Sequence, residues 1–143
     1  MALTPSKFNK YTDALSKGTV NWSSDTFKIA LFNATPVVAD DTYTVITGRI
    51  SEVANGNGYT TAGATVGSTG ATNSTGTESF AGSAVTFTSV TGDMGAFRYA
   101  VLYDSTTGTL IEWVDYGSSI TLHGANSDQF VATFASNVIG TLV

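Results

Sequence analysis

The segment FRYAVLYD, residues 97–104, decides the predicted fold together with LIEWVDY, residues 110–116, which follows the turn 105–108. Successive side chains of a β-strand point to opposite faces, and apolar residues occupy both faces of the first segment. From Phe97 to Tyr103, every second residue is aromatic or β-branched and is expected on one common face. The two segments therefore predict a central β-hairpin that other elements cover on both sides.

The returning segment carries further apolar residues on both of its expected faces. We expect Ile111 and Trp113 on one face, and Val114 and Tyr116 on the other. The bulkiest members of the most regular strands should form the core, because they remove the most apolar surface from water. The residues expected to be buried are Phe97, Tyr99, Val101, Trp113, Phe130 and Phe134.

A single cation, Arg98, interrupts the first segment, and the carboxylates Glu112 and Asp115 lie on the returning one. A cation among apolar residues is tolerated when a carboxylate pairs with it. We interpret Arg98 as half of a structural ion pair with Glu112 or Asp115, and a functional site is the alternative. Glu112 and Asp115 are three residues apart on a strand, so they lie on opposite faces and form no glycosidase acid–base pair.

Beyond the hairpin, the chain from residue 27 onward alternates short runs of Val, Ile, Thr, Phe and Tyr with clusters of Gly, Asn, Asp and Ser. This pattern predicts an all-β fold of residues 1–143 as one domain, a β-sandwich or a jelly-roll or barrel-like arrangement. Further strands are expected at 27–32, 83–88, 119–122 and 129–135, with weaker signals at 43–46, 49–54 and 59–66.

The amino-terminal segment 1–18 differs from the rest because its apolar residues have helical spacing and four of the six cations lie in the first 28 residues. We expect a short helix within 7–17, capped by Ser6 or Thr4 and closed by Gly18. Two interpretations stay open: a helix packed on its own domain, or a basic element that docks onto an acidic surface of a neighbouring molecule. The apolar residues of this helix are Phe8, Tyr11, Ala14 and Leu15.

The segment 67–78, GSTGATNSTGTE, contains one charge and no large apolar residue. Such a composition buries too little apolar surface to offset the entropy of ordering the chain. We therefore expect an exposed, low-complexity loop that is mobile in the isolated protein.

Composition limits the classes of function. Charged residues are 12% of the chain, against roughly 25% in an average globular protein. The chain contains 24 Thr and 15 Ser, no Cys, and a net charge of -5 with a pI near 4.4. An acidic chain lacks the clustered cations that neutralise phosphates, so nucleic acid is not an expected partner. Without a membrane-length apolar run or a secretion signal, we expect no membrane association and synthesis in a cytoplasm.

None of the candidate sites in the sequence has the residue pattern of a known catalytic, metal-binding or phosphate-binding motif. His123, the single histidine, lies in a turn-forming LHGAN motif, and no G-x-S-x-G sequence accompanies it. Asp40 and Asp41 are interpreted as a solvated turn, with oxygen ligands for a shared Ca²⁺ as the alternative. The sequence NGNG, residues 55–58, lacks the Lys of a phosphate loop and is expected to be a tight turn with positive φ. We therefore predict no catalytic, cofactor-binding or metal-binding residue.

Three motifs stand out together: NGNGY at 55–59, FRYAVLYD at 97–104, and LIEWVDYGSS at 110–119 followed by ITL at 120–122. In combination they resemble a family of small β-rich virion proteins of tailed bacteriophages. The likeness spans residues 27–135. Members of this family are regarded as capsid decoration (cement) proteins or as tail components, and the family has no catalytic motif.

The resemblance implies a virion structural protein, and a surface with few ions suits contacts between copies because few charges are desolvated. Our leading hypothesis is a capsid decoration protein that binds itself, as a homotrimer at three-fold positions, and the major capsid protein or other virion proteins. The alternatives are a tail or fibre component, and a carbohydrate-binding module that uses exposed Trp22, Trp113 or Tyr rings. An enzyme is the least favoured class.

Overall fold

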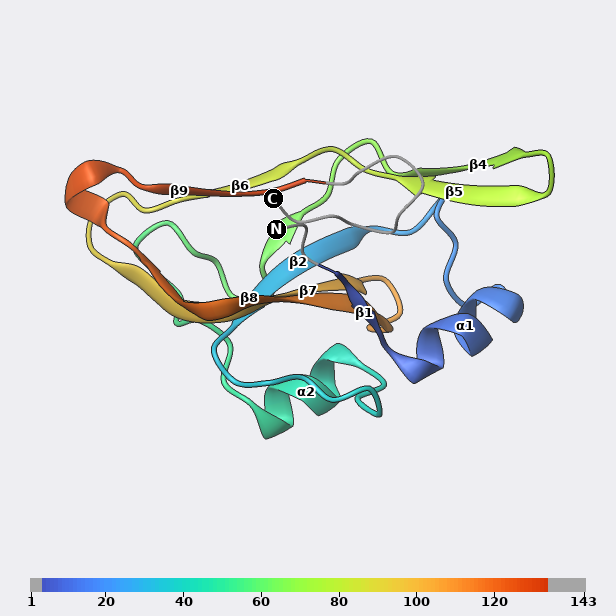
Figure 1. The fold of residues 1–143 in the computed structure, drawn as a ribbon, viewed down its shortest axis with the longest axis horizontal. Helices are drawn as coiled ribbons and strands as arrows, with labels where there is room; N and C mark the ends of the chain where they lie inside the picture. Colours follow the sequence, from blue (N-terminus) through green and yellow to red (C-terminus); the bar gives the residue numbers. More distant parts are fainter. Residues whose placement is uncertain (1–3, 134–143) are drawn as a thin grey trace.

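The computed structural model describes residues 4–133 and shows a layered, mostly β chain (Figure 1). Its central layer is an antiparallel sheet with the order β1-β8-β7-β2-β3. A second layer contains the two-stranded sheets β6-β9 and β4-β5, and α2 lies on the opposite side of the central sheet (Figure 1). The predicted all-β, sandwich-like fold is confirmed. The elements are β1 (Ser6–Lys7), α1 (Asn9–Ser16), β2 (Phe27–Phe32), α2 (Tyr43–Arg49), β3 (Ala64–Thr65), β4 (Gly70–Ser74), β5 (Thr77–Ala81), β6 (Val85–Thr88), β7 (Met94–Asp104), β8 (Leu110–Leu122), the 3₁₀ turn η1 (Gly124–Asn126) and β9 (Gln129–Ala132).

Two hydrophobic cores flank the central sheet. The main core lies between the two strand layers and includes Phe27, Phe87, Phe97 and Phe130. The α2 core lies beneath α2 and includes Phe32, Ile46, Tyr99, Val101 and Trp113. Both faces of the sheet are therefore covered, as the apolar character of residues 97–104 predicts.

The strict alternation expected along the central hairpin is broken twice. The register of β7 against β8 shifts between Phe97 and Tyr99, so Phe97 belongs to the main core and Tyr99 to the α2 core. A second shift, next to Leu102, places Ile111 in the main core and Trp113 in the α2 core. The predictions that these pairs share a face are wrong, because a β-bulge inserts one residue and reverses the alternation beyond it.

The predicted turn between β7 and β8 is built around Asp104, which is fully buried. Its Oδ1 accepts a hydrogen bond from the Thr106 backbone N–H at 2.8 Å, and its Oδ2 accepts one from Thr107 Oγ1 at 2.6 Å. Gly108, with φ of +80°, donates its backbone N–H to the Asp104 carbonyl at 2.8 Å. An Asp side chain that binds its own turn in this way fixes the hairpin.

Several predicted strands are shorter, longer or differently divided in the structure. The strand 27–32 is confirmed as β2, whereas the segment expected at 83–88 is reduced to β6. The segments expected at 110–116 and 119–122 form one strand, β8, which continues through Gly117 at φ of +81°. Within the described residues, the strand expected at 129–135 is β9, and that expected at 59–66 is the short β3.

The strand prediction for 43–46 is wrong, because α2 occupies Tyr43–Arg49, and the one for 49–54 retains only an isolated bridge at Glu52. The run YTVIT has a high β propensity, but Thr42 caps a helix here by accepting a hydrogen bond from the Val45 N–H at 3.4 Å. Ile46 is then fully buried in the α2 core, so tertiary packing overrides the local preference.

The helix expected within 7–17 is α1, and Gly18 follows it at φ of +68° as expected. Neither Ser6 nor Thr4 caps it: Phe8 is at the N-cap position, and the cap has no side-chain hydrogen bond. The aromatic ring of Tyr11 is buried, and its hydroxyl accepts a hydrogen bond from Trp22 Nε1 at 2.9 Å. These contacts favour the interpretation that α1 packs on its own domain over the one in which it docks onto a neighbouring molecule.

The segment 67–78 is not an irregular loop, which corrects our expectation. β4 and β5 form an antiparallel hairpin from Gly70↔Ala81 to Ser74↔Thr77, although residues 71–76 are exposed. Its turn residues Thr75 and Gly76 have φ of +50° and +80°, as in a type I′ turn. The hairpin extends as an arm beside α1 at one end of the molecule (Figure 1).

The predicted core is confirmed where the structure describes it. Phe97 and Val101 are fully buried, and Tyr99, Trp113 and Phe130 are no more than 8% exposed. The sixth predicted core residue, Phe134, lies outside the described residues. No helix within residues 4–133 is both long enough and apolar enough to cross a bilayer.

Candidate binding surface

Charged residues are distributed unevenly between the two strand layers. Between Glu52 and Asp93 the sequence contains one charged residue, Glu78, and this interval includes β3, β4, β5 and β6. β9, which completes the second layer among the described strands, has none. The ion pairs of the described residues lie in the central sheet, the helices and the turns. They are Lys10–Asp41, Lys17–Asp13, Arg49–Asp40 and Arg98–Asp115, and the His123 ring lies beside the Asp93 carboxylate.

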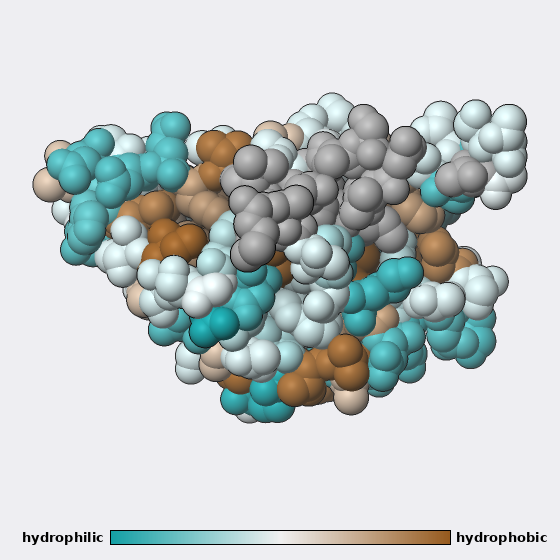
Figure 2. Space-filling view, in the orientation of Figure 1, coloured by the Kyte–Doolittle hydropathy of each residue, from teal (hydrophilic) through white to brown (hydrophobic). Residues whose placement is uncertain are grey.

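An apolar cleft of about 330 Å³ lies between the hairpin arm and the end of α1. Figure 2 shows hydrophobic surface between the pale, hydroxyl-rich arm and the segment below it. A cavity of about 150 Å³ already accommodates benzene, so this cleft has room for a small apolar group or side chain. The residues that line it are Leu15, Gly18, Val20, Asn21, Trp22, Ser23, Ala71, Glu78 and Phe80.

Trp22 forms one wall of this cleft and packs between two other aromatic rings. The Trp22 ring stacks on Phe27 at 4.1 Å between centroids and contacts Phe80 of β5 at 4.9 Å. Phe80 is thus the large apolar residue through which the arm packs against the rest of the domain. The arm and the cleft form one surface, in which Glu78 is the one charged residue and aromatic rings form the floor.

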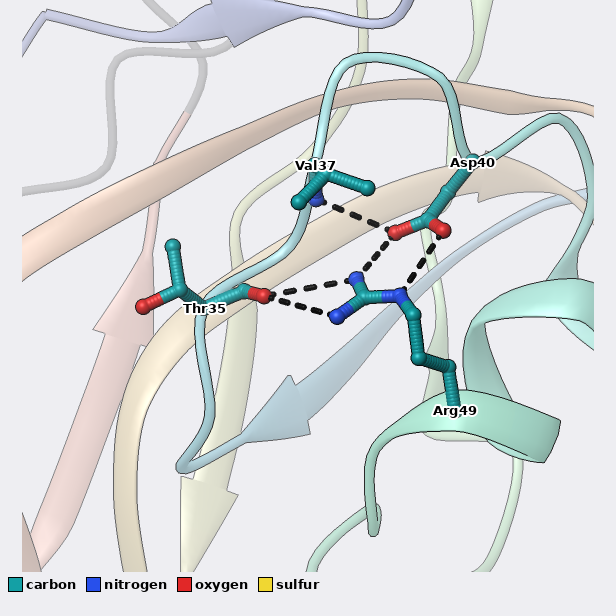
Figure 3. Close-up of polar contacts among 4 residues, drawn as sticks. All are labelled: Thr35, Val37, Asp40 and Arg49. Atoms are coloured by element: carbon teal, nitrogen blue, oxygen red, sulfur yellow. Dashed lines mark hydrogen bonds and ion pairs between the residues drawn. The ribbon is translucent and has the colours of Figure 1, made fainter.

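A second apolar surface lies on the opposite side of the molecule, around α2. Val37 and Val38 in the preceding loop and Val45 on α2 are 44–50% exposed, and Figure 2 shows hydrophobic surface in this region. Their loop is held in place by Asp40, which is 3% exposed, and by Arg49 (Figure 3).

The Asp40–Arg49 pair clamps the loop onto α2. Arg49 Nε donates to Asp40 Oδ1 at 3.0 Å, its Nη2 donates to Asp40 Oδ2, and both Nη atoms lie 3.3 Å from the Thr35 carbonyl (Figure 3). Asp40 Oδ2 also accepts the Val37 N–H at 3.1 Å. Burial alone would raise the pKa of Asp40, but the hydrogen bonds from Arg49 and Val37 hold it below its usual value.

The suggested Ca²⁺ ligands Asp40 and Asp41 are therefore divided between two structural roles. Asp40 has both oxygens bound by Arg49, and the expectation that it is solvated is wrong. Asp41 lies 3.9 Å from Lys10 Nζ, and both side chains are about half exposed. Within residues 4–133, no three metal-ligating side chains lie close together.

Replacing Asp40 with alanine is expected to lower the free energy of unfolding by about 2 kcal/mol, because Arg49 and the Val37 N–H lose their acceptor. The matched control is Asp41→Ala, with an expected change of about 0.5 kcal/mol or less, since its ion pair is exposed. Urea unfolding of both variants measures the difference. Equal losses, or a wild-type midpoint that rises with added Ca²⁺, would contradict this assignment.

The predicted ion pair of Arg98 is confirmed, and Asp115 is its partner. Arg98 Nε and Nη2 donate to the two oxygens of Asp115 at 2.6 and 2.8 Å, and this pairing lowers the pKa of Asp115. Glu112, the other suggested partner, is 5% exposed and lies opposite Lys7 in the register of β1 and β8. Burial raises the pKa of Glu112 to about 9, a feature that its sequence context does not reveal.

His123 lies at the end of β8, where its Nδ1 is 3.1 Å from Asp93 Oδ2 and both side chains are more than half exposed. The NGNG sequence forms the predicted turn: Gly56 and Tyr59 exchange backbone hydrogen bonds, and Asn57 has φ of +53°. Asn57 Nδ2 also donates to the Asp93 carbonyl at 2.9 Å, which ties this turn to the one before β7. His123 and the NGNG sequence are therefore both parts of turns.

The two tryptophans proposed as carbohydrate platforms are buried. Trp22 is 3% exposed, and Trp113 is 8% exposed, with its ring 4.5 Å from that of Phe8. A sugar stacks on the face of an exposed ring, which neither residue offers. This removes the two tryptophans, though not the Tyr rings, from the platforms of the carbohydrate hypothesis.

The fold and surface define a small β-sandwich protein with a hairpin arm whose one charged residue is Glu78. The chain matches no protein-family model, and comparison with curated proteins and with solved structures finds no match.

Proposed function

We propose that this protein is a structural component of a tailed-phage virion, a capsid decoration protein that binds copies of itself and the major capsid protein. The observation that carries the proposal is the exclusion of charge from one strand layer and its arm, where Glu78 is the one charged residue in 40 positions. Two copies with a net charge of -5 each repel each other. This repulsion is weakest where the charge-poor surfaces of the two copies meet.

Two further features support an assembling protein. The second layer is rich in Ser and Thr, so its contacts desolvate hydroxyl groups rather than ions. On the opposite side, the exposed Val37, Val38 and Val45 offer a second apolar contact. A subunit of a shell needs at least two surfaces, one for its own kind and one for the lattice beneath. The three-fold arrangement and the virion location follow from the sequence resemblance and remain predictions.

Copy number in purified particles tests this proposal against its alternative. A decoration protein is present in numbers comparable to the capsid subunit, whereas a tail or fibre component is present in a few copies. Quantitative mass spectrometry of particles of the encoding phage, with the major capsid protein as the internal standard, gives the ratio. A few copies per particle would favour the tail or fibre role, and absence from particles would overturn a virion role.

A further inference from the structure

The hairpin arm has an open hydrogen-bonding edge among the described strands. β4 pairs with β5 over five residue pairs, from Gly70↔Ala81 to Ser74↔Thr77, and with no other described strand. An isolated two-stranded ribbon is marginally stable in water, and an unpaired edge is a template for another strand.

The turn geometry determines which backbone groups point outward. In a two-residue type I′ hairpin the residues that flank the turn, here Ser74 and Thr77, form a hydrogen-bonded pair. Hydrogen-bonded and non-hydrogen-bonded pairs then alternate along the ribbon. The N–H and C=O groups of Ala71 and Asn73 therefore point to the outer edge of β4.

This edge lacks the devices that usually prevent pairing. Protected edges have charged residues, proline or a bulge, whereas β4 has the sequence GATNS and a continuous register with β5. The charge of the arm is on β5, where Glu78 accepts a hydrogen bond from Asn73 Nδ2 at 3.0 Å. Pairing through β5 would place two Glu78 carboxylates on adjacent strands. Pairing through β4 separates them by three strand spacings, about 14 Å, beyond the screening length of about 8 Å.

We propose that β4 pairs antiparallel with β4 of a second copy, centred on Thr72, to form a four-stranded ribbon in the order β5-β4-β4-β5. Ala71 then lies opposite Asn73 of the second copy, and their outward backbone groups hydrogen-bond. The contact is two-fold, because the same strand is used by both copies. This inference rests on the proposed function: it joins copies that belong to neighbouring three-fold groups on a shell.

The area of one such contact is small, so its strength comes from repetition. Five-residue strands bury less surface than a stable isolated dimer requires. On a lattice each further contact is effectively intramolecular, and weak contacts then combine into stable binding. The test must therefore detect a weak contact of defined geometry.

A cysteine at Thr72 reports this geometry directly, because the chain has no other cysteine. In the proposed register, the two copies of residue 72 form a non-hydrogen-bonded pair with Cα atoms about 4.5 Å apart, within disulfide range. Thr72→Cys is expected to form a disulfide-linked dimer under mild oxidation. The matched control is Ser74→Cys, which is equally exposed on the same face of the arm but lies four residues out of register with its copy. It is expected to stay reduced.

A second pair of variants tests the backbone edge without a cross-link. Asn73→Pro removes the outward N–H, and Asn73→Ala keeps that N–H; both lose the side-chain bond to Glu78. In the Thr72→Cys background, Asn73→Pro is expected to abolish cross-linking and Asn73→Ala to preserve it, with circular dichroism unchanged in both.

Equal cross-linking of the Thr72→Cys and Ser74→Cys variants would overturn the arm pairing, as would cross-linking that survives Asn73→Pro. These outcomes are separate from the test of the proposed function. Protein abundant in particles that fails to cross-link at residue 72 keeps the virion role and rejects the arm pairing. Specific cross-linking of a protein that is absent from particles keeps the arm pairing and rejects the virion role.

Discussion

Replacing Phe130 with alanine is expected to lower the free energy of unfolding by about 3–5 kcal/mol, the range for removing a large aromatic side chain from a core. Phe130 joins the second layer to the central sheet. Its ring lies 5.0 Å from that of Phe97 on β7, 5.1 Å from Tyr116 on β8 and 6.2 Å from Phe87 on β6, between centroids. Its removal leaves a cavity that three strands cannot all close.

Urea unfolding, followed by tryptophan fluorescence, measures this loss. The matched control is Val131→Ala, the next residue on β9, which is half-buried and is expected to cost about 1 kcal/mol or less. An unchanged midpoint for Phe130→Ala would show that β9 does not pack on the main core.

Replacing Glu112 with glutamine is expected to remove a pH dependence of stability. Burial raises the pKa of Glu112 from 4.5 to about 9, although the ammonium of Lys7 lowers it in part. Between these values the folded state keeps the proton and the unfolded state releases it. Rising pH therefore favours unfolding, and the stabilisation present below pH 4.5 is lost as pH rises towards 9, at about 1 kcal/mol per pH unit.

Urea unfolding at pH 5, 7 and 9 tests this expectation. The free energy of unfolding of Glu112→Gln, relative to that of the wild type, should rise with each step in pH. The reason is that the amide has no proton to release on unfolding. The control Glu78→Gln, on the exposed arm, should follow the wild-type profile within error. Parallel profiles for the Glu112→Gln variant and the wild type would mean that this carboxyl group is solvated in the native state.

The parts of the fold that the sequence predicts are those where apolar residues alternate on buried strands. β2, β7, β8 and β9 contain Phe, Tyr, Val and Ile in such a pattern, and the structure buries most of them. The errors within these strands come from β-bulges next to Phe97 and Leu102, because inserting a residue leaves no trace in composition.

The elements that were missed depend on contacts distant in sequence. α2 forms because Ile46 enters a core built by β2, β7 and β8 and because Arg49 binds Asp40, which outweighs the β propensity of its residues. The β4-β5 hairpin has no apolar alternation, and its anchor is one ring, Phe80, against Trp22. Its one local signal is Thr75-Gly76 between runs of hydroxyl residues, a weak form of the Asn-Gly turn signature.

The candidate surface was predictable in part from the spacing of charges. The interval between Glu52 and Asp93 is visible in the sequence as 40 positions with one charge. Only the fold shows that this interval forms most of one layer and an arm beside an apolar cleft. The ion-pair partner of Arg98 was limited to two carboxylates by the hairpin, and the register selected Asp115.

The central claim is that this chain acts by assembling with itself, and sedimentation velocity of the isolated protein tests it most directly. Measured from micromolar to millimolar concentration, the protein is expected to shift reversibly from the monomer of 14.8 kDa to larger species. The shift should persist at high salt, because the proposed contact strand β4 is uncharged and repulsion between acidic copies is screened. A single monomeric species over the whole range, at low and high salt, would contradict the claim.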